Sequence, residues 1–195
     1  MIFDLPTFIQ SVGLIGIGAV VFLESGILVG MFLPGDSLLF TAGILASAGY
    51  LHFIPLLVVT FGCAVLGNQV GYYTGRKYGP RIFSRPNSRW FNPEHIVKAQ
   101  AFYEKYGKKT IILCRFIPFV RTVAPIMAGV GLMNSKSFTL YNVVGGALWA
   151  VGMTSLGYFL GSTIPNIEKY IIPIVLGIIL ISVIPVLTKL LHKKT

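Results

Sequence analysis

The sequence predicts an all-α, polytopic membrane protein, and three observations support this fold class. Hydrophobic residues make up 54% of the 195 residues and charged residues only 11%, whereas soluble domains carry about 25% charged residues. Several apolar stretches reach the roughly 20 residues that a helix needs to cross a bilayer. The basic residues are concentrated in a few short segments. We therefore expect a single membrane domain over residues 1–195.

Two long apolar stretches make up the first part of the chain. The stretch 5–33 is interrupted only by Glu24, and the stretch 37–75 contains no Asp, Glu, Lys or Arg. The second stretch is too long for one membrane-spanning helix and short for two such helices with a loop. We therefore predict a re-entrant hairpin at about 35–50, followed by a transmembrane helix at about 53–75.

A basic segment at 76–109 follows and contains nine of the sixteen Lys and Arg residues. Three more close the chain at Lys189, Lys193 and Lys194. Cytoplasmic segments of membrane proteins are enriched in Lys and Arg, so we expect segment 76–109 and both termini to be cytoplasmic. This rule and anionic lipid head groups account for the net charge of +10 without nucleic-acid binding.

Within the basic segment, Asn92, Pro93 and Glu94 predict the start of a helix. Asn is a favoured cap, Pro fits the first helical position and Glu suits the first turn. The helix should end near Tyr106, before Gly107. Because one face is apolar and the other charged, we expect this helix to lie on the cytoplasmic membrane surface.

The second part of the chain resembles the first in its organisation. The stretch 110–135 is apolar but contains two arginines and two prolines, which a continuous membrane helix tolerates poorly. We predict a second re-entrant hairpin there, followed by transmembrane helices at about 138–161 and 170–189. Irregular backbone at membrane depth persists only where protein or a watery cavity covers it.

The chain also contains a weak internal repeat. Ala42–Gly43 matches Ala128–Gly129, and Gly71–Gly75 matches Gly157–Gly161, both with an offset of 86 residues. By the charge rule, the first long helix ends in the cytoplasm and the second begins there, so the halves are inverted. Inverted repeats with broken helices are typical of secondary transporters. In a chain with 22 glycines, chance recurrence is the alternative.

Four charged residues lie inside the apolar stretches, next to predicted helix breaks. They are Glu24, Asp36, Arg115 and Arg121. The expected breaks of the two hairpins are at Pro34, Gly35, Pro118 and Pro125. A charge in hydrocarbon costs roughly 2.5–3.5 kcal/mol on insertion scales, so these residues need partners or a task. If the two hairpins meet, two acids face two arginines.

Such a cluster can bind an anion and exchange protons. Arg115 and Arg121 suit a substrate phosphate, because a guanidinium stays charged and binds phosphate with two parallel hydrogen bonds. Glu24 and Asp36 suit proton coupling, because burial favours the protonated form of a carboxyl group, whereas a nearby arginine favours the charged form. The alternative is a purely structural salt-bridge cluster that holds the hairpins together.

Glycine recurs at every fourth position in the first long helix. The positions are Gly67, Gly71, Gly75 and Gly79. Small residues at this spacing let helix backbones approach closely, so we predict that they serve helix packing. Asn68 lies in the same ladder at membrane depth.

The sequence argues against an enzyme. The three histidines lie outside the segment 115–121, and no metal-ligand spacing joins them. A Ser/His/Asp order and a Gly-rich phosphate loop are also missing. We therefore expect no catalytic residue, no metal site and no cofactor.

These motifs together resemble the bacterial DedA family, which shares its domain with eukaryotic lipid scramblases of the endoplasmic reticulum. The resemblance covers a core of about 24–161. It is carried by Glu24-Ser-Gly, Phe32-Leu-Pro34-Gly35-Asp36, Gly67-x-x-x-Gly71-Tyr-Tyr-x-Gly75-Arg-x-x-Gly79, Arg115-Phe-Ile-Pro118-Phe-Val-Arg121 and Ala128-Gly129.

The resemblance implies lipid translocation across the bacterial plasma membrane, with undecaprenyl phosphate or a phospholipid as substrate and a link to proton-motive force. It also implies that Glu24 and Asp36 are essential acids and that Arg115 and Arg121 are essential arginines. Asn68 departs from the Asp of many members. Alternatives are a proton-coupled antiporter of small ions or cationic compounds, and a non-transporting envelope scaffold. A flippase predicts a groove open sideways to lipid, whereas an antiporter predicts a closed aqueous path.

Overall fold

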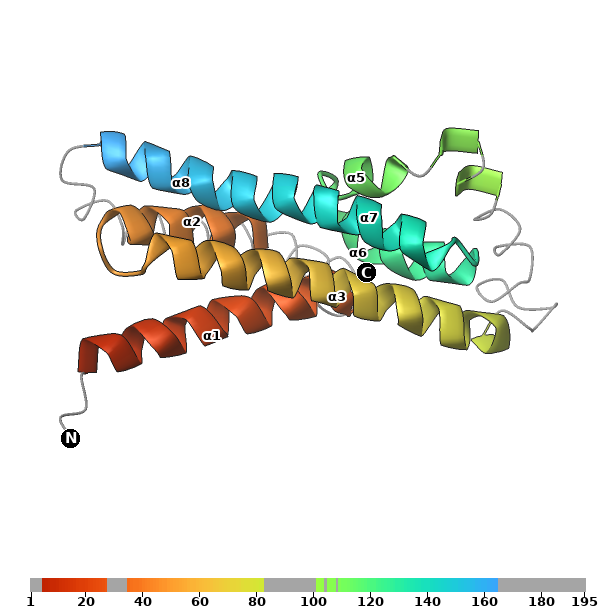
Figure 1. Cartoon of the computed structure of the whole chain (residues 1–195), viewed down its shortest axis with the longest axis horizontal. Helices are drawn as coiled ribbons and strands as arrows, with labels where there is room; N and C mark the ends of the chain where they lie inside the picture. Colours follow the sequence, from red (N-terminus) through yellow and green to blue (C-terminus); the bar gives the residue numbers. More distant parts are fainter. Residues whose placement is uncertain (1–4, 28–34, 83–100, 104, 108, 165–195) are drawn as a thin grey trace, which may run out of the picture. The chain divides into compact units, whose positions relative to one another are not determined.

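The computed structural model describes residues 5–27, 35–82, 101–103, 105–107 and 109–164, and every regular element in these ranges is helical (Figure 1). In chain order the elements are α1 (Leu5–Gly26), α2 (Gly35–Ser47), α3 (Phe53–Ile82), α5 (Thr110–Cys114), α6 (Pro118–Val130), α7 (Ser135–Gly146), the π-helical turn η2 (Ala147–Val151) and α8 (Gly152–Thr163). The all-α prediction is therefore confirmed over these ranges.

Among the described residues, two stretches of helix are long and apolar enough to cross a membrane, at Phe53–Gly79 and Ser135–Thr163. They cover the transmembrane helices predicted at 53–75 and 138–161. The helix α3 continues to Ile82, because a cluster of basic residues ends an apolar span without ending a helix. The helix predicted at 170–189 lies outside the described residues.

The chain divides into two compact units, each built from several segments. Unit 1 comprises Met1–Val21, Phe32–Phe61 and Ala150–Thr195, and unit 2 comprises Phe22–Met31 and Gly62–Trp149. A single membrane domain over 1–195 stays a prediction.

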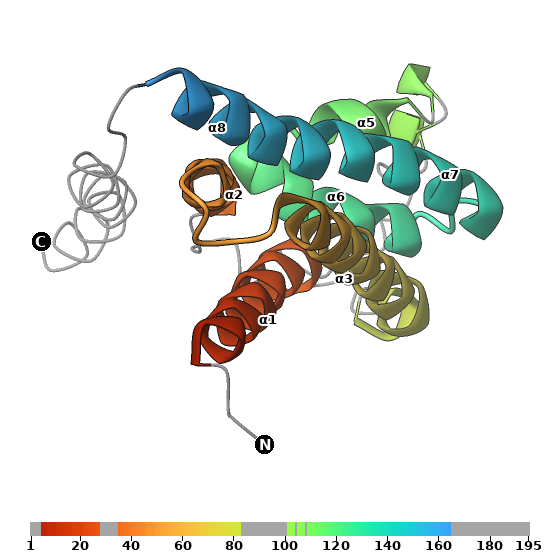
Figure 2. The ribbon, with the colours of Figure 1, turned by 60° about the vertical axis from the view of Figure 1, so that its left-hand side comes forward.

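In unit 1, α2 packs against α8 (Figure 2). A Cβ on Gly43 would collide with the backbone of Thr154 and Tyr158, and a Cβ on Gly157 would collide with the carbonyl of Phe40. The two helix backbones therefore touch directly, which only small residues allow. A cluster of apolar side chains covers the end of this pair, where the rings of Phe53 and Tyr158 stack at 4.1 Å.

In unit 2, α6 packs against α3 in the same way. A Cβ on Gly75 would collide with the carbonyl of Ile126, and a Cβ on Gly129 would collide with the backbone of Tyr72. The core beside this contact includes Tyr72, whose ring stacks on Phe138 at 4.3 Å. Glycine at these positions keeps α6 and its side chains at a fixed distance from α3.

The two helix pairs follow one pattern, although the register differs from the one that the sequence suggests. Gly43 on α2 corresponds to Gly129 on α6, with the predicted offset of 86. On the long helices, however, Gly157 corresponds to Gly75. A Cβ on Gly157 would meet the carbonyl of Phe40, and a Cβ on Gly75 would meet the carbonyl of Ile126, which lies 86 positions after Phe40. The offset of 82 between Gly75 and Gly157 is about one helical turn from the predicted match of Gly157 with Gly71.

The segments predicted as re-entrant hairpins each contain a short helix. Over the first hairpin, α2 has 13 residues and is followed by a turn in which Gly49 has φ +84°. Over the second, α6 also has 13 residues. Both helices are shorter than the roughly 20 residues that cross a bilayer. Their re-entrant course through a membrane and the inversion of the halves stay predictions.

The chain breaks between α5 and α6 at the first of two prolines. Ile117 has an extended backbone, with φ −110° and ψ 110°, and Pro118 begins α6. A proline disfavours helical backbone at the preceding residue and fits the first helical position. Pro125 was predicted as a further break, but it lies inside α6, so this prediction is wrong. A proline removes one helical hydrogen bond, and the helix continues because its residues from Pro125 onward pack closely on α3.

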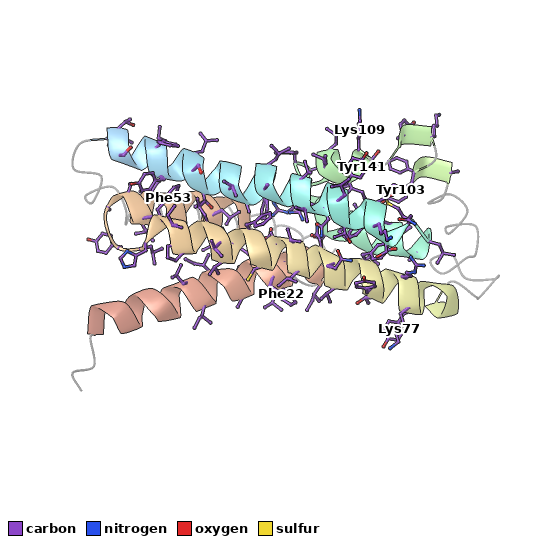
Figure 3. The ribbon with its side chains drawn as sticks, in the orientation of Figure 1. Phe22, Phe53, Lys77, Tyr103, Lys109 and Tyr141 are labelled. Atoms are coloured by element: carbon purple, nitrogen blue, oxygen red, sulfur yellow. The ribbon has the colours of Figure 1, made fainter. Side chains whose placement is uncertain are left out.

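The predicted surface helix is described only at its end. Residues 101–103 and 105–106 are helical, and the turn closes at Gly107, which has φ +75° and donates to the carbonyl of Tyr103 at 3.0 Å. Tyr103 and Tyr141 pack against the core of unit 2 (Figure 3). The predicted start at Asn92 lies outside the described residues.

Candidate functional site

Unit 2 contains three of the four charged residues that the sequence places at membrane depth. Glu24 lies near the end of α1, Arg115 follows the last residue of α5, and Arg121 lies in the first turn of α6. Their exposed fractions are 1%, 3% and 8%. Helix geometry and the break before Pro118 therefore bring two cations and one carboxylate into the interior of one unit.

Glu24 and Arg121 form an ion pair, although 97 residues separate them in sequence. Arg121 Nη2 donates to Glu24 Oε1. Among the described residues, no group donates to the second carboxylate oxygen, Glu24 Oε2. A buried oxygen without a donor is costly when the carboxylate is charged. This oxygen is therefore a place where a proton can be accommodated.

Arg115 is held by neutral oxygens. Its Nη2 donates to Asn142 Oδ1 at 2.5 Å and to the carbonyl of Ala64 at 3.3 Å. Asn68, with its amide oriented to satisfy both of its groups, accepts from the same nitrogen at 2.8 Å and donates to the carbonyl of Ser25 at 2.9 Å. Within the described ranges no carboxylate pairs with Arg115, so its positive charge is available to an anion.

The helix α7 makes room for the Arg115 side chain. A Cβ on Gly145 would lie 3.0 Å from Arg115 Cδ, and a Cβ on Gly146 would lie 3.5 Å from both terminal nitrogens. One helical turn earlier on α7, Asn142 is fully buried and donates through Nδ2 to the carbonyl of Val65 at 2.9 Å. That second bond fixes the amide so that its oxygen faces the arginine.

Arg121 also contacts an aromatic ring. Its Cζ lies 4.8 Å from the centre of the Trp149 ring, and Trp149 lies in the π-helical turn η2. Trp149 is 2% exposed. A cation within about 6 Å of an indole face is attracted by the ring quadrupole, so the Trp149 ring is a second partner of this guanidinium.

Asp36 lies in unit 1, in the first turn of α2, and is half-buried. Its membership of the same cluster stays a prediction. Of the predicted breaks, Gly35 is the first residue of α2, and Pro34 lies outside the described residues. The four ladder glycines face neighbouring helices: Gly67 meets α1, and Gly71, Gly75 and Gly79 meet α6.

Two residues of the site do not follow from the sequence reasoning. Asn142 is a polar residue in an apolar helix, which is a signal of an interior hydrogen bond. Trp149 reads as a packing residue in the sequence, and nothing local to it indicates a π-helical turn. In the part of the chain that the structure describes, no group of three His, Cys, Asp or Glu residues could hold a metal ion.

Comparison with known proteins identifies the family. The model of the VTT domain matches residues 33–159. The chain is 44% identical to Protein DedA of Escherichia coli K12 over 177 residues, which is 90% of this chain and 80% of that protein. It is 42% identical over 173 residues to an uncharacterized membrane protein of Mycobacterium leprae, covering 89% of this chain and 77% of the relative.

A further relative is inner membrane protein YqjA of Escherichia coli K12, which is 37% identical over 154 residues, 77% of this chain and 68% of the relative. No solved structure matches the chain. The apolar helices of spanning length agree with the membrane location in the names of these relatives. The chain therefore belongs to the DedA family of VTT-domain membrane proteins.

Proposed function

We propose that this protein moves a phosphate-bearing lipid across the bacterial inner membrane, with a polyprenyl phosphate such as undecaprenyl phosphate as the first candidate and a phospholipid as the second. The observation that carries the proposal is Arg115, a buried cation whose described partners are neutral oxygens. An interior cation without a described counter-charge is costly in a membrane. A transient phosphate offsets that cost, because guanidinium and phosphate form paired hydrogen bonds.

The ion pair of Glu24 and Arg121 supports a proposal of proton coupling. Protonation of Glu24 would weaken its hold on Arg121 and make the Nη2 donor that it occupies available to the phosphate. Loss of the proton would restore the pair and release the lipid. Asp36 would supply a second carboxylate if the two hairpins meet, as the sequence predicts. In this scheme the protein moves the lipid without chemical change, needs no cofactor, and keeps both termini in the cytoplasm.

The experiment is reconstitution into liposomes with a labelled polyprenyl phosphate, with and without a pH gradient. Arg121→Lys keeps the charge but loses the paired geometry, so we expect it to transport nearly as poorly as Arg121→Ala. Lys136→Gln is the control for loss of one positive charge, because Lys136 is exposed on α7. Full transport by Arg121→Lys would exclude paired recognition of phosphate.

Glu24→Gln separates coupling from folding. Gln has nearly the same shape as Glu and does not titrate, so the variant should fold and lose the response of transport to the pH gradient. Removing one partner of a buried pair typically costs about 3–5 kcal/mol, so a structural role would instead lower the amount of folded protein. A folded Glu24→Gln protein with an unchanged pH response would remove Glu24 from the mechanism. Cation flux without lipid movement in the same liposomes would favour the antiporter.

A further inference from the structure

The π-helical turn η2 (Ala147–Val151) interrupts an otherwise continuous helix between α7 and α8. π-Helical turns are rare, and they occur frequently at functional sites because the wider turn redirects a side chain. Here the side chain in the middle of the turn is Trp149, and its ring lies on Arg121. The irregularity therefore coincides with the charged site of unit 2.

Arg121 makes two contacts of different kinds in this site, a hydrogen bond with Glu24 and a cation–π contact with Trp149. The donor groups lie in the plane of the guanidinium, and Nη2 donates in that plane to Glu24 Oε1. The Trp149 ring instead attracts the positive charge of the guanidinium, whose Cζ lies 4.8 Å from the ring centre. A guanidinium can hydrogen-bond along its edge and stack on an aromatic face at the same time. The two contacts therefore do not exclude each other.

We propose that Trp149 is a positioning residue for the transported phosphate: it holds Arg121 in place while the Glu24 carboxylate and the lipid phosphate exchange at the edge of the guanidinium. This inference rests on the proposed function. Without the ring, Arg121 loses a contact that fixes its position and does not depend on the protonation of Glu24. With the ring, the N–H donors of Arg121 stay directed at one position, and the phosphate binds a preorganised guanidinium.

The competing explanation is that Trp149 only fills space in the interior. A residue that serves only packing can be replaced by another large apolar side chain, whereas a cation–π partner needs an aromatic face. Indole is the strongest aromatic partner of a cation. Substitution by Phe and by Leu therefore distinguishes the two roles. Tyr158→Leu is the matched control, because it also removes an aromatic side chain from the same run of helix, where its ring stacks on Phe53.

The first test measures transport rate against the concentration of polyprenyl phosphate in the liposomes. For Trp149→Leu we expect the apparent KM to rise by about 30-fold, which is the factor that corresponds to a desolvated cation–π contact. Trp149→Phe should recover part of this loss, and Tyr158→Leu should leave the apparent KM near that of the unaltered protein. Equal KM values for the Leu and Phe variants would overturn the proposal, and so would an equal rise in the control.

The second test does not depend on transport. The chain contains two tryptophans, so Trp90→Phe leaves Trp149 as the sole tryptophan. The indole excited state has a large dipole, and its emission wavelength responds to a charge at its face. We expect the emission wavelength of this purified single-tryptophan protein to shift when the Arg121→Gln substitution is introduced into it, and to stay unchanged when Lys136→Gln is introduced instead. An emission that is unaffected by Arg121→Gln would overturn the contact itself.

Titration of the single-tryptophan protein with a short-chain polyprenyl phosphate completes the test. A saturable emission change that Arg121→Gln abolishes supports exchange of the phosphate at Arg121. No change on titration overturns the positioning role for phosphate. A protein whose emission responds to Arg121→Gln but which moves no phosphate-bearing lipid refutes the proposed function separately, because the contact is then intact.

Discussion

Gly67 is the point at which α1 crosses α3, and replacing it with Ala gives a prediction that depends only on packing. A Cβ at this position would lie 2.6 Å from the carbonyl oxygen of Phe22 and 2.9 Å from Ser25 Cβ. Ordinary contact begins at 3.4 Å, so the α1 backbone has to retreat by about 0.8 Å. Backbone has no alternative rotamer, and the whole helix end must move.

The matched control is Gly62→Ala on the same helix, because a Cβ there has nothing within 4 Å. Both substitutions gain up to about 1 kcal/mol of intrinsic helix preference. Overpacking typically costs about 1–3 kcal/mol and applies only to Gly67→Ala. The difference between the two variants therefore isolates the collision. We expect Gly67→Ala to be less stable than Gly62→Ala by about 1–3 kcal/mol.

The assay is thermal unfolding of the purified proteins in one detergent, followed by helical circular dichroism. For a chain of this length 1 kcal/mol moves the midpoint by about 2–4 °C, so the two variants should differ by about 2–12 °C. Transport should also fall in Gly67→Ala, because retreat of α1 separates Asn68 from the carbonyl of Ser25. A midpoint for Gly67→Ala equal to or above that of Gly62→Ala would refute the packing argument.

Three further predictions concern the site, the surface helix and the topology. Arg115→Lys loses the fork that reaches Asn142, so we expect at least about tenfold slower initial transport in liposomes; full activity would mean that a point charge suffices. Burial raises the pKa of Tyr103 above its ordinary value of about 10, so the stability held by the neutral hydroxyl is complete below about pH 10 and is lost as pH rises further. Unfolding midpoints should therefore fall above pH 10 in the unaltered protein and less in Tyr103→Phe, and parallel curves would contradict this. An impermeant thiol reagent should not label cysteines introduced at Ser88 or Thr195 in intact cells, and labelling of either would exclude the cytoplasmic location of that segment.

Elements with a local physical cause could be predicted from the sequence. The break before Pro118 follows from the backbone that a proline imposes on its neighbour, and the end of the surface helix follows from the left-handed conformation that Gly107 adopts readily. The pairing of Glu24 with an arginine follows from the cost of an unpaired charge at membrane depth. Which arginine it would meet did not follow, because that depends on packing between distant segments.

Other features could not be derived for identifiable reasons. A ladder with glycine at every fourth position looks the same after a shift of four, so the sequence could not distinguish Gly71 from Gly75 as the counterpart of Gly157. Pro125 was predicted as a break because local preference favours one, whereas packing of α6 on α3 maintains the helix. The π-helical turn at Trp149 has no local signature, since one residue more per turn changes neither composition nor hydropathy.

The packing of α2 on α8 has a consequence for the order in which the protein is made. The two glycines that bring these helices together, Gly43 and Gly157, are separated by about 110 residues of chain, so the contact is strongly non-local. At ribosomal rates of about 5–20 residues per second, α2 waits for about 5–20 s before its partner exists. During that interval its small-residue face must be shielded by lipid, by the translocation machinery or by an insertase. Biogenesis, as well as stability, is therefore sensitive to the residues on that face.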